Sequence, residues 1–378
     1  MSEHEWGISE VDIYRRIAEL LADDREAALA TIVSVDGSAY RRPGAKMLVA
    51  ADGDSYGLIT AGCIEDEVRE LVEAVLGAGE PHVETYDLME DDDIWGLGLG
   101  CNGIIDVLVE PISTDFATLI DAVSMRRPIG QLTIVGESEA IGARAYFQDG
   151  EWIAVDDAIP DWVLEEVAGA TKTLIAEDKA ETITVEAGDT TMQVFIEGIQ
   201  PAPRLLVLGS GPDVGPLVEL GRKNGYDVGV VSFRGAVDIE ARFPVANSHY
   251  STKPAMLSDE VPLDGQTYAV VMTHNFLDDR IAMGELLDAD VPYIGLMGPR
   301  KRFAEMSEDF AAEGRHFSEE EMSRIFTPVG LDLGSGSPYG IATSVIAEVM
   351  AVASGRTPQH LKTREGPIHD RASLEAIK

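Results

Sequence analysis

The strongest constraint on the fold is an alternation of apolar runs and amphipathic segments that begins at Arg204. The runs "RLLVLG", "YDVGVVSF", "YAVVMTH" and "VPYIGLMG" are typical of buried strands. Between them stand segments typical of helices, namely "PLVELGRKNG", "LDDRIAMGELLDA" and "PRKRFAEMSEDFAAEG". This alternation predicts a parallel, doubly wound sheet, because each helix carries the chain back to begin the next strand in the same direction. We expect the domain over residues 204–356, ending with a helix that has Ser337 as N-cap and Pro338 at its first position.

The first part of the chain predicts a mixed α+β domain over residues 1–115. Apolar residues at helical spacing predict helices over 11–23 and 64–76. The runs "ALATIVSV", "KMLVA" and "SYGLIT" predict strands, the last two as a hairpin around Asp52-Gly53. A glycine-rich stretch then leads into a strand over 104–109, which completes this domain.

Residues 116–203 predict a β-rich middle segment and linker. The runs "QLTIVG", "ARAYFQD", "WIAV", "KTLIAE", "ETITVE" and "MQVFIEGI" favour strands, and "QPAPR" is a short linker. The tail over 357–378 is polar. The fold class is therefore α/β, with an N-terminal α+β domain followed by a C-terminal parallel-sheet domain.

The charge balance excludes several classes of partner. The 67 acidic and 29 basic residues give a net charge of −38, and the acids are scattered through patterned segments. Such a surface repels nucleic acids and anionic membranes and is typical of halophilic proteins. The apolar runs are short and the N-terminus is polar, so we expect neither a membrane span nor a signal peptide, and we expect a cytoplasmic protein.

The segment "VLGSGPDVGPL" follows a strand and opens a helix, which is the context of a dinucleotide-binding turn. Gly209 permits the tight turn, and Gly211 lets the backbone approach a phosphate. Val214 stands at the third glycine position, and Ser232 replaces the acid that would bind a ribose. Arg234, two residues later, is a candidate for meeting a phosphate. Two interpretations stay open: a nucleotide or other phosphate ligand, and a Rossmann-like fold with a different anion site.

Both cysteines stand in glycine-containing turns. Cys63, after Gly62, precedes a predicted helix whose N-terminus favours thiolate, although the acids that follow oppose it. Cys101, after Gly100, lies in "WGLGLGCNG", where exposed amides and one thiol can hold an anion, bind a soft metal or carry sulfur. Cys101 is therefore the candidate metal ligand. The alternative is that each cysteine is a small buried residue.

Three cations occur close together in "DGSAYRRPGAKML". Arg41, Arg42 and Lys46, with Ser38, predict a clamp for a phosphate or a carboxylate. The alternative is a turn in which the arginines pair with surface acids.

Two further turns of the C-terminal domain carry candidate ligands. His274 follows a predicted strand, where sites occur in open α/β sheets, and Asn275 and Asp279 are candidates to orient it. Gly298 and Arg300, in "GLMGPRKR", lie in another strand-to-helix turn that can contribute to the same site.

Taken in order, seven segments resemble one family. They are "ATIVSVDGSAYRRPGAKMLV", "AGCIEDEV", "WGLGLGCNG", "VLGSGPDVGPL", "VMTHN", "YIGLMGPRKR" and "VGLDLGSGSPYGIATSVIAEVMA". The chain resembles the XdhC/CoxI family from about residue 9 to about residue 356. Members are accessory proteins of xanthine dehydrogenase and other molybdenum hydroxylases. The resemblance implies a protein that binds molybdenum cofactor, protects it, and helps to insert its sulfurated form into an apo-hydroxylase. It also implies a cysteine desulfurase partner and a homodimer.

The resemblance carries over to particular residues. The family's cysteine-glycine turn falls on Cys101, and its glycine-glycine-cysteine turn falls on Cys63. The chain departs from the family at Ala61, where glycine is usual, and at Asn102, where many members have glycine. The loop at residues 209–212 follows the variant of the Rossmann turn that contains proline, here Pro212.

These observations predict a molybdenum cofactor chaperone, an accessory protein rather than an enzyme. Ser38, Arg41, Arg42 and the glycine turns would hold the phosphate of molybdopterin, and Cys101 with Cys63 would supply a soft ligand. Two alternatives remain: an NAD(P)-dependent oxidoreductase built on residues 204–356, and a non-catalytic scaffold between desulfurase and hydroxylase. The client is open among xanthine dehydrogenase, carbon monoxide dehydrogenase-type enzymes and aldehyde oxidases.

Overall fold

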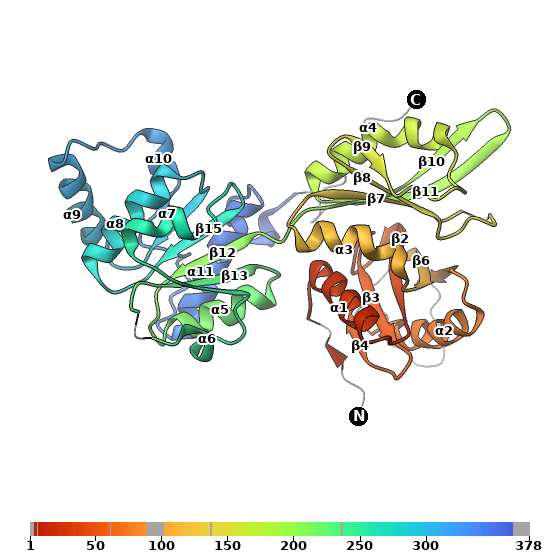
Figure 1. Cartoon of the computed structure of the whole chain (residues 1–378), viewed down its shortest axis with the longest axis horizontal. Coiled ribbons are helices and arrows are strands. Elements are labelled where there is room, and N and C mark those ends of the chain that lie inside the picture. The colour runs from red at the N-terminus through yellow and green to blue at the C-terminus, as the bar shows by residue number, and fades with distance from the viewer. Residues whose placement is uncertain are drawn as a thin grey trace. The chain divides into compact units, whose positions relative to one another are not determined.

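The chain divides at Pro201 into two compact units, and the second unit begins at Ala202. Figure 1 traces their helices and strands along the chain. Each unit has its own sheets and apolar core, so each is described by itself. The computed structural model describes residues 4–5, 7–60, 62–88, 102–136, 138–235 and 237–365.

The first sheet of the first unit has six strands in the order β1-β4-β3-β2-β6-β5. Its strands are β1 (His4–Glu5), β2 (Ala27–Ser38), β3 (Lys46–Ala50), β4 (Ser55–Gly57), β5 (His82–Asp87) and β6 (Asn102–Pro111). β1 pairs parallel with β4, and the other neighbours pair antiparallel. The predicted hairpin around Asp52-Gly53 is confirmed, because β3 and β4 pair antiparallel across it.

Two predicted helices, α1 (Glu10–Ala22) and α2 (Glu65–Ala78), cover this sheet. α1 packs in a core cluster with Leu29 of β2, whereas α2 packs in a cluster with Ala28 and Ala30. Successive residues of a strand point to opposite faces of a sheet. The two helices therefore cover opposite faces.

A second, antiparallel sheet of the first unit has the order β10-β11-β7-β8-β9. Its strands are β7 (Ile129–Ile134), β8 (Arg144–Gln148), β9 (Glu151–Ile153), β10 (Ala180–Ala187) and β11 (Thr190–Ile199). The helical elements of this region are η1 (Thr114–Phe116), α3 (Ala117–Ser124) and α4 (Asp161–Glu177). The predicted strand "KTLIAE" is wrong, since it forms the last turns of α4. Val163, Val167 and Leu174 are buried at helical spacing and pack in one cluster with strands of this sheet.

Two buried ion pairs join the two sheets of the first unit. Lys46 of β3 is 2% exposed, and its Nζ lies 2.5 Å from Oε1 of Glu197 in β11. Arg144 of β8 pairs with Glu110 of β6, and both side chains are buried. Burial raises the pKa of Glu197 and of Glu110 above their ordinary values, against the opposing effects of Lys46 and Arg144. Lys46 is therefore a structural residue, and its predicted place in an anion clamp is wrong.

The second unit contains a parallel sheet of six strands in the order β14-β13-β12-β15-β16-β17. Counted along the chain, this is the order 3-2-1-4-5-6 of the doubly wound dinucleotide-binding fold. The predicted parallel sheet is confirmed. Its strands are β12 (Arg204–Leu208), β13 (Asp227–Ser232), β14 (Ser248–Ser251), β15 (Thr267–Val271), β16 (Tyr293–Leu296) and β17 (Ile325–Phe326).

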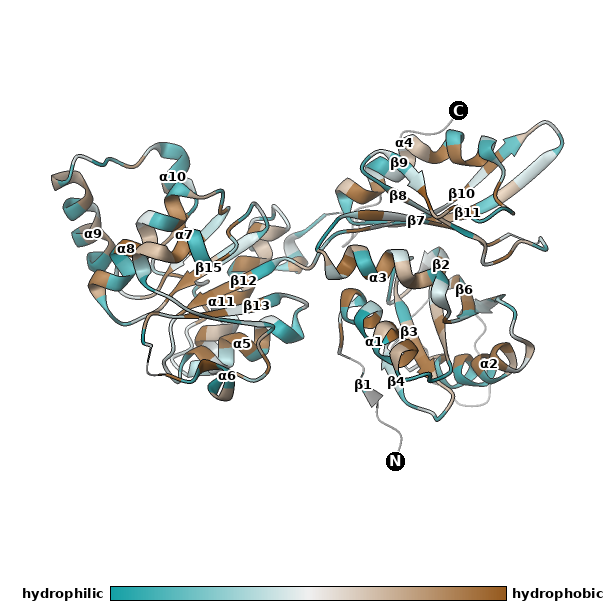
Figure 2. Ribbon diagram, in the orientation of Figure 1, coloured by the Kyte–Doolittle hydropathy of each residue, from teal (hydrophilic) through white to brown (hydrophobic). Residues whose placement is uncertain are grey.

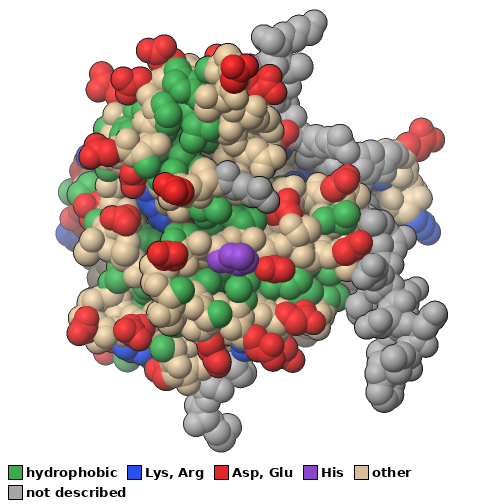
Figure 3. Space-filling model, turned by 90° about the vertical axis from the view of Figure 1, so that its right-hand side faces the viewer, with side chains coloured by type: hydrophobic (Ala, Val, Ile, Leu, Met, Phe, Trp, Pro, Cys, Tyr) green, Lys and Arg blue, Asp and Glu red, His purple; other side chains and the backbone are tan. Residues whose placement is uncertain are grey.

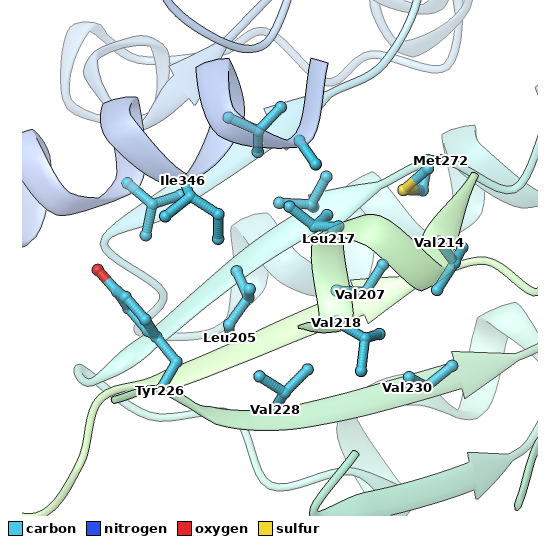
Figure 4. Close-up of a cluster of buried hydrophobic side chains, with 14 of the residues drawn as sticks. Leu205, Val207, Val214, Leu217, Val218, Tyr226, Val228, Val230, Met272 and Ile346 are labelled. Atoms are coloured by element: carbon cyan, nitrogen blue, oxygen red, sulfur yellow. The ribbon is translucent and has the colours of Figure 1, made fainter. Parts of the chain in front are cut away.

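Helices cover both faces of this parallel sheet. Leu205 and Leu217 pack with Ile346 of the last long helix on one face (Figure 4), whereas Leu206 packs with Met306 in a separate cluster on the other. In Figure 2 helices such as α5 show both hydrophobic and hydrophilic colours, as expected for helices with one buried side. The helical elements are α5 (Val214–Lys223), α6 (Ile239–Arg242), η2 (Pro254–Met256), α7 (Leu257–Glu260), α8 (Phe276–Asp288), α9 (Arg300–Ala312), α10 (Glu319–Ser323), α11 (Pro338–Ala353) and η3 (Leu361–Thr363).

The predicted start of α11 is confirmed. The Ser337 hydroxyl accepts a hydrogen bond from the Gly340 amide at 3.1 Å, and Pro338 occupies the first turn.

The surface carries its acids in a dispersed pattern. On the face shown in Figure 3, acidic side chains stand singly and in small groups between apolar ones, and few basic side chains are visible. This distribution is that of a solvated surface rather than of an acidic tail. Within the described residues, every helix is too short or too polar to span a bilayer.

Candidate functional site

The turn that carries Cys63 lies between β4 and α2. The Thr60 hydroxyl donates to Oε2 of Glu65 at 2.6 Å, and the Thr60 amide donates to Oε1 at 2.7 Å. The Cys63 amide donates to the Thr60 hydroxyl oxygen at 3.1 Å. Gly62 adopts a φ of +99°, in the left-handed region that glycine tolerates. Glu65 is thus buried beneath the turn, and the half-buried Cys63 is fixed at the start of α2.

Cys63 packs on the same apolar cluster as the end of β2. Val35 and Ala39, which flank Ser38 in the sequence, also contact this cluster. The Cys63 turn and the start of the loop with Arg41 and Arg42 therefore pack on one apolar cluster of the first unit.

The register of β2 and β6 bears on the second cysteine turn. Ser38 lies opposite Asn102, the residue that follows Cys101 in the sequence. Gly100 and Cys101 themselves lie outside the described residues. Their roles, including that of Cys101 as metal ligand, stay predictions.

Of the three predicted cations, Arg41 and Arg42 lie in the loop between β2 and β3 and are at least partly exposed, whereas Lys46 is buried at the start of β3. Arg41 pairs with the carboxylate of Glu10, so a surface acid balances its charge, as the alternative interpretation expects. Arg42 is exposed, and its carbonyl oxygen accepts from the Ala45 amide at 3.1 Å. With Lys46 buried, the loop is not a clamp of three cations.

In the second unit, the glycine turn lies where the sheet order reverses, between β12 and β15. Open sheets of this type bind ligands at such a point. A Cβ added at Gly209 would lie 2.7 Å from the carbonyl oxygen of Met272, so the two strand ends approach closely. Arg242 donates to the carbonyl oxygen of Ser210 at 2.6 Å. The turn is therefore tightly held.

His274 contacts the glycine turn directly. It follows β15 with a φ of +61°, and its Nε2 lies 2.8 Å from Oδ2 of Asp213. Neither predicted partner orients it. Asn275 instead caps α8, accepting from the Leu277 amide at 3.0 Å, and Asp279 is buried and accepts from Arg302. The strands β12 and β15 are parallel neighbours, so the residues that follow them lie at the same edge of the sheet. This topology points to Asp213, an acid that follows β12, as the partner of His274.

The turn does not fit a pyrophosphate. The Asp213 carboxylate stands at the N-terminus of α5, where the phosphates of a dinucleotide bind, and it would repel them. Its Oδ1 is buried without a hydrogen-bond partner and would clash with a Cβ on Gly211. Pro212 has no N–H to donate.

The end of β13 does not fit the ribose of a dinucleotide. Ser232 is buried, and its hydroxyl oxygen accepts from the Arg234 amide at 3.2 Å. The Arg234 side chain is exposed. No carboxylate occupies the strand end at Ser232 that would bind a 2′-hydroxyl. The residues present therefore do not fit NAD(P).

The turn after β16 belongs to a cavity of about 440 Å³. Gly298, with a φ of +122°, lines it together with residues 328–329, residues 331–335 and the start of α11. Arg300 is exposed at the first position of α9. The structure thus brings together the separate segments "GLMG" and "VGLDLGS", and sequence reasoning did not single out the lining residues Asp332 and Leu333.

Among residues 4–365 that the structure describes, no group of three or more His, Cys, Asp or Glu side chains is placed to hold a metal ion. A protein-held metal centre of the usual kind is thus not seen in this part of the chain.

Two family models match the chain. The model described as the XdhC and CoxI family matches residues 20–87, in the first unit. The model described as the XdhC Rossmann domain matches residues 205–349, in the second unit.

Similar proteins match over nearly the whole length. A protein of Bacillus subtilis (strain 168), named as a probable subunit of xanthine dehydrogenase, is 32% identical over 336 residues, which cover 88% of this chain and 94% of the relative. "Molybdenum cofactor insertion chaperone PaoD" of Escherichia coli (strain K12) is 21% identical over 347 residues, covering 90% of this chain and 87% of the relative.

A solved structure agrees with the fold. The crystal structure of a xanthine dehydrogenase from Bacillus halodurans superposes with a TM-score of 0.74 at 25% identity, and the match covers 93% of this chain and 97% of that chain. From the two matching family models and the 32% identity over 88% of its length, this chain belongs to the XdhC and CoxI family.

Proposed function

We propose that this protein is an accessory factor that binds molybdenum cofactor and inserts it into an apo molybdenum hydroxylase. One observation carries the proposal: the similarity to an insertion chaperone spans 90% of the chain and both units. The Bacillus subtilis relative, which is named for xanthine dehydrogenase, supports a hydroxylase of that type as the client.

The residues of the first unit fit such a ligand in part. When bound, the cofactor supplies a dithiolene-held molybdenum and an anionic phosphate. Cys63 offers a soft sulfur donor at a turn with an exposed, left-handed Gly62, so that backbone and thiol can approach a ligand from one side. The hydrogen bonds from Thr60 to the buried Glu65 fix that turn before the ligand arrives.

The finer steps extend this proposal. We place Cys101, with Cys63, on the cofactor and Arg41 and Arg42 near its phosphate. A cysteine desulfurase would supply the sulfur that the cofactor receives while it is held, and the protein would act as a homodimer. The solvated acidic surface favours work away from nucleic acids and anionic membranes.

Cofactor loading tests the proposal. The protein is purified from its host under anaerobic, reducing, high-salt conditions, and bound cofactor is measured by mass spectrometry and by activation of an apo-hydroxylase. We expect wild type to carry cofactor and both Cys63→Ala and Cys101→Ala to lose most of it. Lys46→Met with Glu197→Leu and Tyr14→Phe is the control, because it removes a buried ion pair together with the hydroxyl that donates to Glu197. Equal loading of all variants would refute the thiol role, and a wild-type protein without cofactor would refute the function.

The second candidate function is that of an NAD(P)-dependent oxidoreductase, and the Rossmann-type strand order is the observation that favours it. Asp213 at the phosphate position and Ser232 at the ribose position weigh against it. Nicotinamide titration separates the two candidates.

A further inference from the structure

The cavity beside β16 has the dimensions of a small-molecule site. Its volume of about 440 Å³ lies within the roughly 300–1,000 Å³ of ligand pockets. Its lining does not include the His274–Asp213 pair, so it is distinct from the switch point of the sheet.

One wall of the cavity is a loop fixed upon α11. The Gly330 amide donates to Oε2 of Glu348 at 2.9 Å, and the Ser344 hydroxyl donates to the carbonyl oxygen of Leu331. The Leu331 amide donates back to the Ser344 carbonyl at 3.2 Å. These contacts hold the backbone of the wall in place, so the cavity is preformed.

The remaining lining is apolar apart from a few polar groups. Leu333 is 53% exposed and Ile341 is 38% exposed, so both present apolar surface to the open cavity. Met297 and Val329 add to these walls. Such walls suit the faces of a flat ring.

Asp332 is the one carboxylate in this lining. It forms no hydrogen bond or ion pair with another residue that the structure describes, and it is exposed. Asp332 lines the cavity beside the apolar residues Leu331 and Leu333. Its two oxygens can accept two hydrogen bonds from adjacent donors of one ligand, as a carboxylate does from a guanidinium fork.

We propose that this cavity binds a planar heterocycle with an amino group next to a ring N–H, and that Asp332 recognises this edge. Pterins have such an edge, and this cavity of the second unit is separate from the residues of the first unit that we propose hold molybdenum cofactor. The ring faces lie against Leu333, Ile341 and Met297, and the amino edge meets Asp332. Asp332 and Leu333 are specificity-determining residues of this site.

A comparison of two probes tests the site in the full-length protein. Pterin and lumazine have the same ring system, but lumazine carries an oxygen in place of the amino group. Fluorescence titration in reducing, high-salt buffer should give wild type a preference for pterin of about tenfold or more, because lumazine lacks one of the two donors that bond to the Asp332 carboxylate. Asp332→Asn should abolish the preference, whereas Asp309→Asn, a matched change of an exposed acid on α9, should keep it.

A third variant checks the apolar walls. Leu333→Ala should weaken pterin and lumazine alike and leave the preference unchanged. Equal binding of the two probes by wild type, or an unchanged preference in Asp332→Asn, would overturn the site. Cofactor loading of the cysteine variants judges the proposed function separately, so pterin selectivity without cofactor loading would keep the site and remove the function.

Discussion

The two units bury charge in different ways. In the first unit, Lys46 with Glu197 and Arg144 with Glu110 lie inside, and each pair spans the two sheets. In the second unit, buried Asp279 pairs with Arg302, which is partly exposed. The second unit also buries Arg204 and Glu348, but their partners Asp264, Tyr293 and Gly330 belong to its one sheet or to loops beside it, and its two main clusters are apolar.

This difference teaches how each unit specifies its packing. In the second unit, alternating strands and helices bury their apolar sides on one sheet because their apolar residues follow the periods of strand and helix. Two sheets packed together can slide, and a buried ion pair penalises every arrangement that separates its partners. We infer that the ion pairs of the first unit fix the mutual position of its sheets, and that the second unit needs no such device.

Breaking a buried pair should give the largest effect. Glu197→Leu leaves the Lys46 charge buried without its partner and should cost about 3–5 kcal/mol of unfolding free energy. Urea denaturation followed by tryptophan fluorescence measures it, because all four tryptophans precede Pro201 and report on the first unit. Lys46→Met with Glu197→Leu should recover only part of the loss, because the buried Tyr14 hydroxyl still lacks Glu197 as its acceptor. A single variant as stable as wild type would contradict the role given to the pair.

An apolar truncation should affect the second unit instead. Leu217→Ala removes a buried side chain between α5 and α11 and should cost about 3 kcal/mol. Circular dichroism should show part of the helical signal lost at lower urea, while the tryptophan transition stays in place. If both signals shift together, the two units do not unfold independently.

Helix caps offer an equal, smaller change in each unit. Ser9→Ala and Ser337→Ala each remove a side chain that accepts an N-terminal amide, of α1 and of α11, and each should cost about 1 kcal/mol. Only Ser9→Ala should shift the tryptophan transition. Ser9→Thr and Ser337→Thr are the matched controls and should stay close to wild type.

The smallest effect is expected from nicotinamide nucleotides, which should not change the stability of the second unit. A ligand at one hundred times its Kd stabilises the folded state by about 2.7 kcal/mol. NADH and NADPH should leave the unfolding of the second unit unchanged, because Asp213 occupies the phosphate position. A stabilisation that saturates at one nicotinamide per chain would show that the His274–Asp213 contact opens and would restore the oxidoreductase.

Prediction from sequence succeeded where the signal is local. The parallel sheet and the cap at Ser337 follow from periodicity and capping chemistry, which lie within a few residues. The edge strands β14 and β17 were missed, since four and two residues carry too little pattern. The segment "KTLIAE" was assigned as a strand because its short apolar run reads equally well as either type.

Long-range contacts explain the errors at the sites. Lys46 meets Glu197 across 151 residues, and His274 meets Asp213 across 61. No spacing rule links such positions. For His274 the topology offered a hint, because its strand and that of the glycine turn end at one edge. For Lys46 the partner lies on a different sheet, and only the packed structure identifies it.

The position of α11 has a consequence for synthesis of the protein. Val345, Ile346 and Val349 cover Leu205 at the start of the same unit. During translation this face of the sheet stays uncovered until residues 338–353 have left the ribosome, and an uncovered apolar face attracts other chains. Premature termination ahead of α11 would therefore yield an aggregation-prone fragment rather than a shorter working domain.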